Sequence, residues 1–287
     1  LQSYDAVRTD LPDERFVTVG GSQVYVEQWG QVEPVVLIHG FGGSSHNWQR
    51  VAEELGDRYR LIAPDLKGFG WSERPEDGES YSFDSMVQTV VEVMEELNIG
   101  RAHIIGHSYG GGIALWLAAS NPQRVRSLTL VDSTFPGTEF GPGPQFPRAG
   151  PLTPVLVQGM LRRRFVRVAL ENSYYEPEKV DEALVDDYLV RLRIEGAERA
   201  FRGLTAKSAR PSGEIDPGDL EVPVLVVWGA DDPLIDAWLG QQFAAAVPDG
   251  RFRLLPDCGH TPLEEKPHEF VEAVEPFLQR HGPEAAD

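Results

Sequence analysis

Short apolar runs alternate with helical stretches along most of this chain. Residues 15–19 and 22–29 alternate between apolar and polar positions, and Gly20-Gly21 joins them, which predicts an antiparallel hairpin. Six further runs are continuously apolar or nearly so, as is typical of strands buried on both faces: residues 34–40, 58–65, 101–107, 125–132, 222–229 and 250–257. The pattern therefore predicts eight strands.

Helical periodicity lies between several of these runs. Apolar residues recur three and four positions apart within residues 84–99, 108–122 and 267–282. Strands that alternate with helices favour the α/β class, with a doubly wound and mostly parallel eight-stranded sheet led by the antiparallel hairpin.

The alternation breaks once, over about ninety residues between Asp132 and Val222. This stretch starts with a segment rich in Pro and Gly, residues 133–151, and continues with amphipathic helices within residues 152–170, 177–193 and 196–210. A helical insertion hinged by such loops predicts a cap over the strand ends, inserted after the sixth strand. We therefore expect three parts, namely a first core part at 1–134, a cap at 135–218 and a second core part at 219–287.

Composition excludes several classes of protein. The formal charge of −19 argues against a nucleic-acid surface, and no apolar run is long enough for a membrane span. The single cysteine, Cys258, permits neither an intramolecular disulfide nor a cysteine-based zinc site. Residues 1–15 are too polar for a signal peptide, and the chain begins with Leu1, so an upstream segment could have been removed. Localisation stays open, with a soluble, cytoplasmic protein favoured.

Residues 106–110, GHSYG, fit the pattern G-x-S-x-G and lie between a predicted buried strand and a predicted helix. In this context the pattern predicts a tight turn that exposes the serine, Ser108, above the sheet edge. A serine hydroxyl needs a base and an orienting acid to act as a nucleophile. His260 follows the last predicted strand, and Asp231 and Asp232 both follow the strand before it, so either aspartate fits the acid.

Five motifs in this order resemble the α/β-hydrolase fold superfamily, in the group related to bacterial carboxylesterases, C–C bond hydrolases and cofactor-independent haloperoxidases. The motifs are LIHGFGG (37–43), PDLKGFGWS (64–72), GHSYGG (106–111), WGADDP (228–233) and GHTPLEEKP (259–267). The resemblance covers roughly residues 15–281, with the cap as the most variable part.

The resemblance implies a Ser-Asp-His catalytic triad. Ser108 would be the nucleophile, His260 the general base and Asp232 the orienting acid, with Asp231 as the less favoured alternative. The family's oxyanion hole implies the backbone N–H groups of Phe41 and Tyr109. The glycine-rich stretch GFGGSS (40–45) lacks the lysine of a phosphate loop, so nucleotide binding is rejected. No metal and no organic cofactor is expected.

The implied function is a serine esterase that cleaves carboxylic esters of small to medium hydrophobic substrates through an acyl-enzyme. Ser108 argues against haloalkane dehalogenases and epoxide hydrolases, which carry aspartate at this turn, and Thr261 stands where C–C bond hydrolases usually carry tryptophan. The same triad could support perhydrolase or lactonase activity. A ligand sensor with very slow turnover is the alternative from another class. The expected partner is a small-molecule ester, and the oligomeric state stays open.

Overall fold

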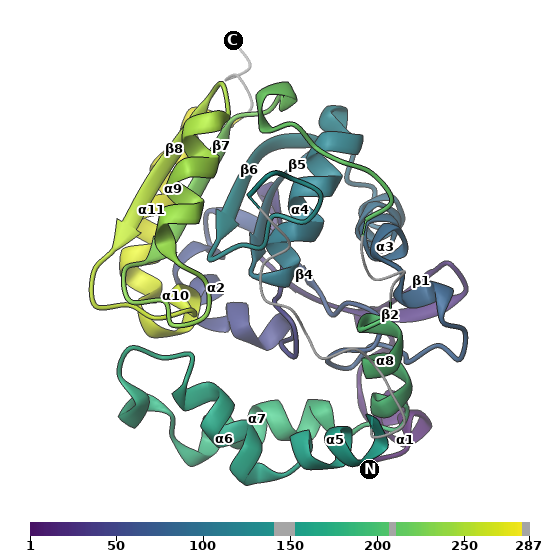
Figure 1. Cartoon of the computed structure of the whole chain (residues 1–287). Helices are drawn as coiled ribbons and strands as arrows, with labels where there is room; N and C mark the ends of the chain where they lie inside the picture. Colours follow the sequence, from purple (N-terminus) through teal and green to yellow (C-terminus); the bar gives the residue numbers. More distant parts are fainter. Residues whose placement is uncertain (141–152, 207–210, 283–287) are drawn as a thin grey trace.

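An eight-stranded sheet forms the centre of the computed structural model, which describes residues 1–140, 153–206 and 211–282 (Figure 1). The strand order is β1-β2-β4-β3-β5-β6-β7-β8, with β1–β2 and β2–β4 antiparallel and the other neighbours parallel. The strands are β1 (Phe16–Val19), β2 (Ser22–Trp29), β3 (Glu33–Ile38), β4 (Tyr59–Pro64), β5 (Ala102–His107), β6 (Val125–Val131), β7 (Val224–Gly229) and β8 (Gly250–Leu255). The predicted α/β fold class is confirmed.

Continuous apolar strands give this sheet two hydrophobic faces. In β3, Val36 and Ile38 belong to one buried cluster, whereas Val35 and Leu37 belong to another, because successive side chains of a strand point to opposite faces. The first cluster packs against α3 (Phe83–Glu96), α4 (Tyr109–Ser120) and α9 (Ala237–Ala246). The second packs against α2 (Gln49–Leu55), α10 (Pro262–Glu265) and α11 (Pro267–Arg280).

The helices of the core were only partly predictable. The three predicted core helices are present as α3, α4 and α11. Neither α2 nor α9 was predicted, because α2 has only seven residues and α9, AWLGQQFAAA, has no clear polar stripe. Of the helices described, none combines the length and the apolar character that a membrane span requires.

In the described part of the chain between β6 and β7 there are four cap helices: α5 (Thr153–Met160), α6 (Arg163–Glu171), α7 (Glu182–Leu192) and α8 (Ala197–Leu204). Figure 1 shows α5, α6 and α7 in a layer below the core. The helix predicted within 152–170 is divided in two, because Arg162 is extended and the carbonyl of Leu161 accepts a hydrogen bond from the Arg193 side chain. Residues 141–151 of the Pro- and Gly-rich stretch and residues 207–210 of the last predicted cap helix lie outside the described residues.

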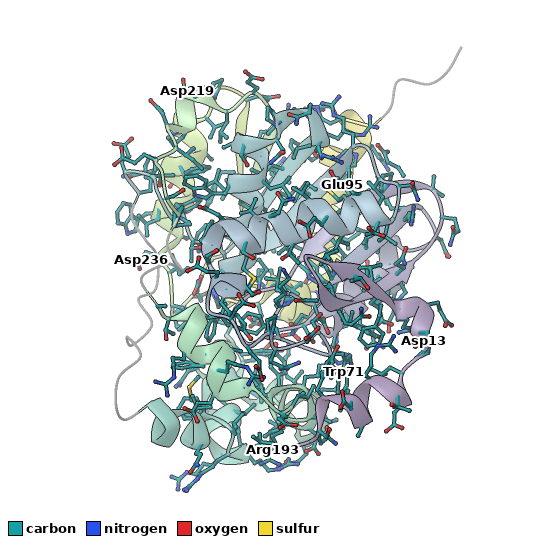
Figure 2. The ribbon with its side chains drawn as sticks, turned by 90° about the vertical axis from the view of Figure 1, so that its right-hand side faces the viewer. Asp13, Trp71, Glu95, Arg193, Asp219 and Asp236 are labelled. Carbon is teal, nitrogen blue, oxygen red and sulfur yellow. The ribbon has the colours of Figure 1, made fainter. Side chains whose placement is uncertain are left out.

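The N-terminal segment packs on the cap. The Gln2 N–H donates to the carbonyl of Arg193 at 2.7 Å, and the Glu195 N–H donates to the carbonyl of Gln2 at 2.8 Å. Figure 2 shows Arg193 on the cap side of the molecule, near α1 (Tyr4–Asp10). The first core part expected at 1–134 therefore begins with residues that contact the cap.

Asp65, directly after β4, joins two loops at the carboxyl edge of the sheet. Its carboxylate accepts the Ser45 N–H and the Trp71 N–H, each at 2.6 Å, and its side chain is fully buried. Its carbonyl accepts the hydroxyl of Ser72 at 2.6 Å. A buried carboxylate with these partners holds the loop after β3 against the loop after β4.

We expect Asp65→Ala to lower the free energy of unfolding by about 3 kcal/mol, because the backbone N–H groups of Ser45 and Trp71 lose a charged acceptor. Asp13, whose side chain is 88% exposed in its pair with Arg8, is the matched control. Asp13→Ala should change the free energy of unfolding by less than about 0.5 kcal/mol. Urea denaturation followed by tryptophan fluorescence measures both, and equal losses would contradict the structural role of Asp65.

Candidate active site

Ser108 occupies a strained turn between β5 and α4. Its backbone has φ 51° and ψ −116°, a region that residues with a side chain rarely adopt. The flanking glycines permit the turn, because a Cβ on Gly106 would lie 2.4 Å from the carbonyl oxygen of Gly110. A Cβ on Gly110 would lie 2.4 Å from the carbonyl oxygen of Ile38. The G-x-S-x-G pattern therefore reflects direct contact of α4 with the strand ends.

The side chains of Ser108, His260 and Asp232 form one hydrogen-bonded chain. They follow β5, β8 and β7, three parallel strands whose carboxyl ends meet at one edge of the sheet. His260 Nδ1 lies 2.8 Å from Asp232 Oδ2, and His260 Nε2 lies 3.0 Å from Ser108 Oγ. Because Nδ1 faces a carboxylate, it carries the proton, and Nε2 accepts from the hydroxyl. Ser108 is 7% exposed and His260 5% exposed.

The two adjacent aspartates have different surroundings. Asp232 lies against His260, and its other oxygen accepts the N–H groups of Leu234 at 2.8 Å and Ile235 at 3.1 Å. Burial alone would raise the pKa of Asp232, but the hydrogen bond from His260 and these two amides outweigh it and hold the pKa below its ordinary value. Asp231 is exposed. Of the two aspartates that the sequence left open, Asp232 is therefore the one that faces His260.

The backbone of His260 is held from two sides. Its N–H donates to the carbonyl of Ser173, in the cap segment after α6, at 2.7 Å. Its carbonyl accepts the Nε2–H of His107 at 2.7 Å. Burial lowers the pKa of His107 to about 3, so this ring stays neutral and keeps its role as a donor from Nε2. The cap therefore contacts the histidine loop directly.

Glu265 fastens the same loop. Its carboxylate accepts the N–H of Gly259 at 3.2 Å and the N–H of Thr261 at 3.2 Å, which are the two neighbours of His260. It also accepts the N–H of Tyr175, in the cap, at 2.7 Å. One carboxylate therefore connects the cap to both flanks of His260.

The predicted oxyanion donors flank Ser108. Tyr109 is the first residue of α4, where backbone N–H groups have no partner within the helix and the helix dipole is positive. Phe41 follows Gly40, whose backbone packs so closely on the serine that a Cβ there would lie 3.2 Å from the Ser108 Cβ. Phe41 also packs its ring edge-on against Tyr109. Both residues are thus placed beside the hydroxyl.

His39 shapes the loop that carries Phe41. Its Nδ1–H donates to the carbonyl of Gly40 at 2.7 Å, and its Nε2 accepts the N–H of Leu66 at 3.0 Å. Burial lowers the pKa of His39, which keeps the ring neutral with one donor and one acceptor. Neither of these hydrogen bonds involves Ser108, so His39 serves to fix the loop that carries Phe41.

A cavity of about 400 Å³ opens above Ser108 and His260, between the core and the cap. This size falls in the usual range for small-molecule sites. The cavity wall is predominantly apolar, and its apolar members include Phe41, Phe69, Val157, Met160, Leu161, Phe165, Val166, Leu170, Leu192, Phe201, Leu204, Leu234 and Leu263. Most of these residues come from the cap helices, so the cap shapes most of the cavity.

A buried polar cluster on the cavity wall was missed by sequence analysis. Glu264 accepts hydrogen bonds from Asn47 at 2.7 Å, Tyr174 at 3.0 Å and Tyr188 at 3.1 Å. Tyr174 and Tyr188 belong to the cap, whereas Asn47 and Glu264 belong to the core. Burial raises the pKa of Glu264 despite these donors. No local pattern marks the cluster, because its members lie far apart in the chain.

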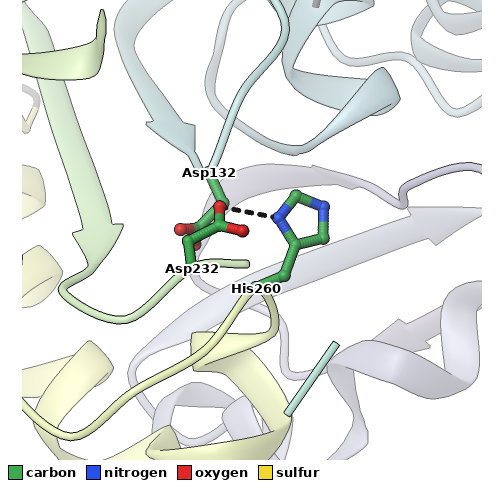
Figure 3. A group of neighbouring side chains, drawn as sticks. All are labelled: Asp132, Asp232 and His260. Atoms are coloured by element: carbon green, nitrogen blue, oxygen red, sulfur yellow. Dashed lines mark hydrogen bonds and ion pairs between the residues drawn. The ribbon is translucent and has the colours of Figure 1, made fainter. Parts of the chain in front are cut away.

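Asp132 was also missed as a site residue. It lies next to Asp232 and His260, and Figure 3 shows the two carboxyl groups side by side with the imidazole ring facing them. Among the described residues, these three form the one group that could hold a metal ion by ligand type and spacing. His260 Nδ1 lies at hydrogen-bond distance from Asp232 Oδ2. This geometry is that of a proton between the two atoms.

Comparison with known proteins agrees with this fold. A family model described as alpha/beta hydrolase fold matches residues 33–267. The 2-hydroxymuconate semialdehyde hydrolase of Pseudomonas putida is 31% identical over 277 residues, covering 92% of this chain and 93% of that protein. The esterase RhEst1 from Rhodococcus sp. ECU1013 has a crystal structure with a TM-score of 0.73 and 28% identity, covering 93% of this chain and 98% of that one.

A third similar protein is longer than this chain. The dihydrolipoyllysine-residue acetyltransferase component of the acetoin cleaving system of Pseudomonas putida is 31% identical over 262 residues. The match covers 86% of this chain and 64% of that protein, so this chain spans less than two thirds of its length. Fold, family match and relatives lead to the same assignment. The chain belongs to the alpha/beta hydrolase fold family.

Proposed function

We propose that the chain is a serine hydrolase that cleaves carboxylic esters of small to medium hydrophobic substrates through an acyl-enzyme on Ser108. The observation that carries the proposal is the hydrogen-bonded chain from Ser108 through His260 to Asp232 at the floor of an apolar cavity. Nucleophile, base and orienting acid within hydrogen-bond reach are the arrangement that activates a serine hydroxyl.

In the first half of the reaction, Ser108 Oγ attacks the ester carbonyl while His260 Nε2 takes the hydroxyl proton. The amides of Phe41 and Tyr109 donate to the oxyanion of the tetrahedral intermediate. When this intermediate collapses, His260 returns the proton to the departing alcohol, and the acyl group stays on Ser108. Asp232 stabilises the imidazolium and keeps its proton on Nδ1.

In the second half, water replaces the alcohol. His260 takes a proton from the water as it attacks the acyl-enzyme, and the same two amides stabilise the second oxyanion. Collapse releases the carboxylic acid and restores the Ser108 hydroxyl. These residues supply every proton transfer that ester hydrolysis requires.

The cavity supports a preference for neutral, apolar substrates. Its wall is mostly aliphatic and aromatic, and the formal charge of −19 opposes the approach of strongly anionic molecules. We further propose that the chain is divided into core parts 1–134 and 219–287 and a cap at 135–218. The cap decides which substrates enter. Esters that fill about 400 Å³ fit this cavity.

A second candidate is hydrolysis of 2-hydroxymuconate semialdehyde, the substrate in the name of the relative from Pseudomonas putida. This substrate carries a carboxylate, and Arg74 lies on the cavity wall, buried, with hydrogen bonds to the backbone carbonyls of Gly70 and Arg191. This guanidinium also donates to the carbonyl of Ser72, so the hydrogen-bond acceptors described for it are backbone carbonyls. Thr261, where C–C bond hydrolases usually carry tryptophan, counts against the candidate.

A series of p-nitrophenyl esters of increasing acyl length tests the proposal. We expect the wild type to turn over these esters steadily, with an optimum at short to medium chains set by the cavity volume. Ser108→Ala should reduce kcat by at least about 10³-fold, because the acyl-enzyme cannot form. Equal activity of the two proteins would contradict the role of Ser108.

Other results of this assay identify the alternatives. Wild-type activity on 2-hydroxymuconate semialdehyde that exceeds activity on every ester would favour the second candidate. A single burst of p-nitrophenol without steady turnover would favour a ligand sensor. Turnover confined to lactones, or to ester perhydrolysis with added peroxide, would reassign the substrate while keeping the same triad.

The two aspartates should differ sharply. We expect Asp232→Asn to lower kcat about 10³- to 10⁴-fold, because the amide no longer fixes the His260 tautomer or stabilises the imidazolium. Asp231→Asn, an identical change at the exposed neighbour, should leave kcat within about twofold of the wild type. Steady-state kinetics of both variants decide between the aspartates, and a larger loss in Asp231→Asn would reverse the assignment.

Glu265 should act on rate more than on binding. Glu265→Ala removes the acceptor of the amides on both sides of His260, so we expect kcat to fall about tenfold to a hundredfold with a smaller change in KM. Glu269→Ala alters a half-exposed glutamate on α11 and should leave kcat near the wild-type value. A rise in KM with kcat unchanged would show that Glu265 does not position the histidine.

A further inference from the structure

Asp132 is a buried acid that the proposed reaction does not use. It directly follows β6, has a side chain with 0% exposure and adopts a positive φ of 42°. Its N–H donates to the carbonyl of Val227 on β7 at 3.1 Å. Aspartate tolerates this backbone region better than most residues, although the conformation remains uncommon. Its position between β6 and β7 is therefore fixed by the sheet.

The two oxygens of Asp132 have unequal surroundings. Oδ1 accepts the N–H of Gly229 at 2.9 Å, and Oδ2 is buried without a hydrogen-bond partner among the described residues. One carboxyl oxygen of Asp132, one of Asp232 and one ring nitrogen of His260 all lie within 4.8 Å of one another. Figure 3 shows the Asp132 carboxyl beside that of Asp232, and the side chain of Asp132 is fully buried. Two carboxylates this close in a buried place cannot both be ionised.

Hydrogen bonds decide which carboxyl keeps the proton. Asp232 receives donors from His260, Leu234 and Ile235, all of which favour its charged form. Asp132 receives one, from Gly229. Burial raises the pKa of Asp132 well above its ordinary value, and the neighbouring charge of Asp232 adds to this effect. Asp132 is thus the protonated member of the pair.

We propose that Asp132 is a positioning residue of the triad, a neutral carboxylic acid whose O–H donates to the Asp232 carboxylate. The proposal rests on the proposed function for its catalytic consequence. The added donor orients Asp232 so that its Oδ2 stays directed at His260 Nδ1. The unpaired Oδ2 of Asp132 supplies this hydrogen bond once it carries the proton. The proton stays on Asp132 throughout the reaction.

Asp132→Asn and Asp132→Ala test this geometry. An asparagine can accept the Gly229 N–H through its oxygen and donate to Asp232 through its nitrogen, so it reproduces the neutral acid. We expect Asp132→Asn to keep kcat within about threefold, and Asp132→Ala to lower it about tenfold to a hundredfold with KM little changed. An alanine variant as active as the wild type would overturn the proposal.

The pH dependence of kcat/KM separates a neutral from an ionised Asp132. A negative charge beside His260 favours the protonated imidazole, so removing such a charge would move the acidic limb of the profile to lower pH by about one unit or more. We expect no movement in Asp132→Asn, because the wild-type residue is already neutral. Besides His260, the described titratable groups that interact electrostatically with Asp132 are Asp232, Glu265 and Cys258, and the substitution leaves all of them in place. Asp231→Asn, which removes an exposed charge, is the control.

Thermal stability gives a readout that needs no substrate. An unfolded aspartate ionises near pH 4, whereas folded Asp132 keeps its proton to higher pH, so the folded wild type binds more protons than the unfolded chain. Because of Asp132, the free energy of unfolding of the wild type therefore falls as the pH rises. Asp132→Asn lacks this contribution. We expect the Tm of Asp132→Asn minus that of the wild type to increase from about pH 5 to about pH 8.

These outcomes keep the proposal distinct from the proposed function. If ester turnover is absent but the Tm difference grows with pH, Asp132 is neutral and only the substrate assignment fails. A Tm difference that stays constant with pH, or an acidic limb that moves to lower pH, overturns the proposal whatever the substrate. If Asp132→Ala does not fold, Asp132→Asn alone decides through these two measurements.

Discussion

The close approach of α4 to the ends of β3 and β5 is the constraint on which the rest of the site depends. Glycine at 106 and 110 removes the side chains that would hold the helix away, and Ser108 takes up a strained backbone between them. Such strain costs about 1–3 kcal/mol, and burial of the apolar side chains of α4 between the sheet and α3 offsets it. The turn therefore places the Ser108 side chain beside the first backbone N–H of α4.

Parallel strand order brings the remaining groups to that point. Because β5, β6, β7 and β8 are parallel neighbours, the residues that follow them converge on one edge of the sheet. Ser108, Asp132, Asp232 and His260 follow these four strands in turn. Because these groups are buried, their charges interact strongly. Hydrogen-bond donors stabilise the charged carboxylate of Asp232, whereas the neighbouring Asp132 stays neutral.

The cap does more than enclose the cavity. Ser173 and Tyr175 contact the His260 loop through the backbone and through Glu265, while Tyr174 and Tyr188 reach the buried Glu264. The cap therefore supplies both the apolar wall of the cavity and part of the support for the proposed base. Substrate selection and histidine placement depend on the same segment of chain.

The sequence by itself determined the features that local chemistry encodes. Period-two and continuous apolar runs predicted all eight strands, and the glycine frame around Ser108 predicted the turn that presents it. Tertiary structure alone decided which of Asp231 and Asp232 faces His260, and it alone placed Asp132 beside Asp232. It also decided where the helix predicted at 152–170 is interrupted, namely at the extended Arg162, next to the Leu161 carbonyl that accepts from Arg193. These features depend on contacts between residues far apart in the chain, and such contacts leave no local pattern to read.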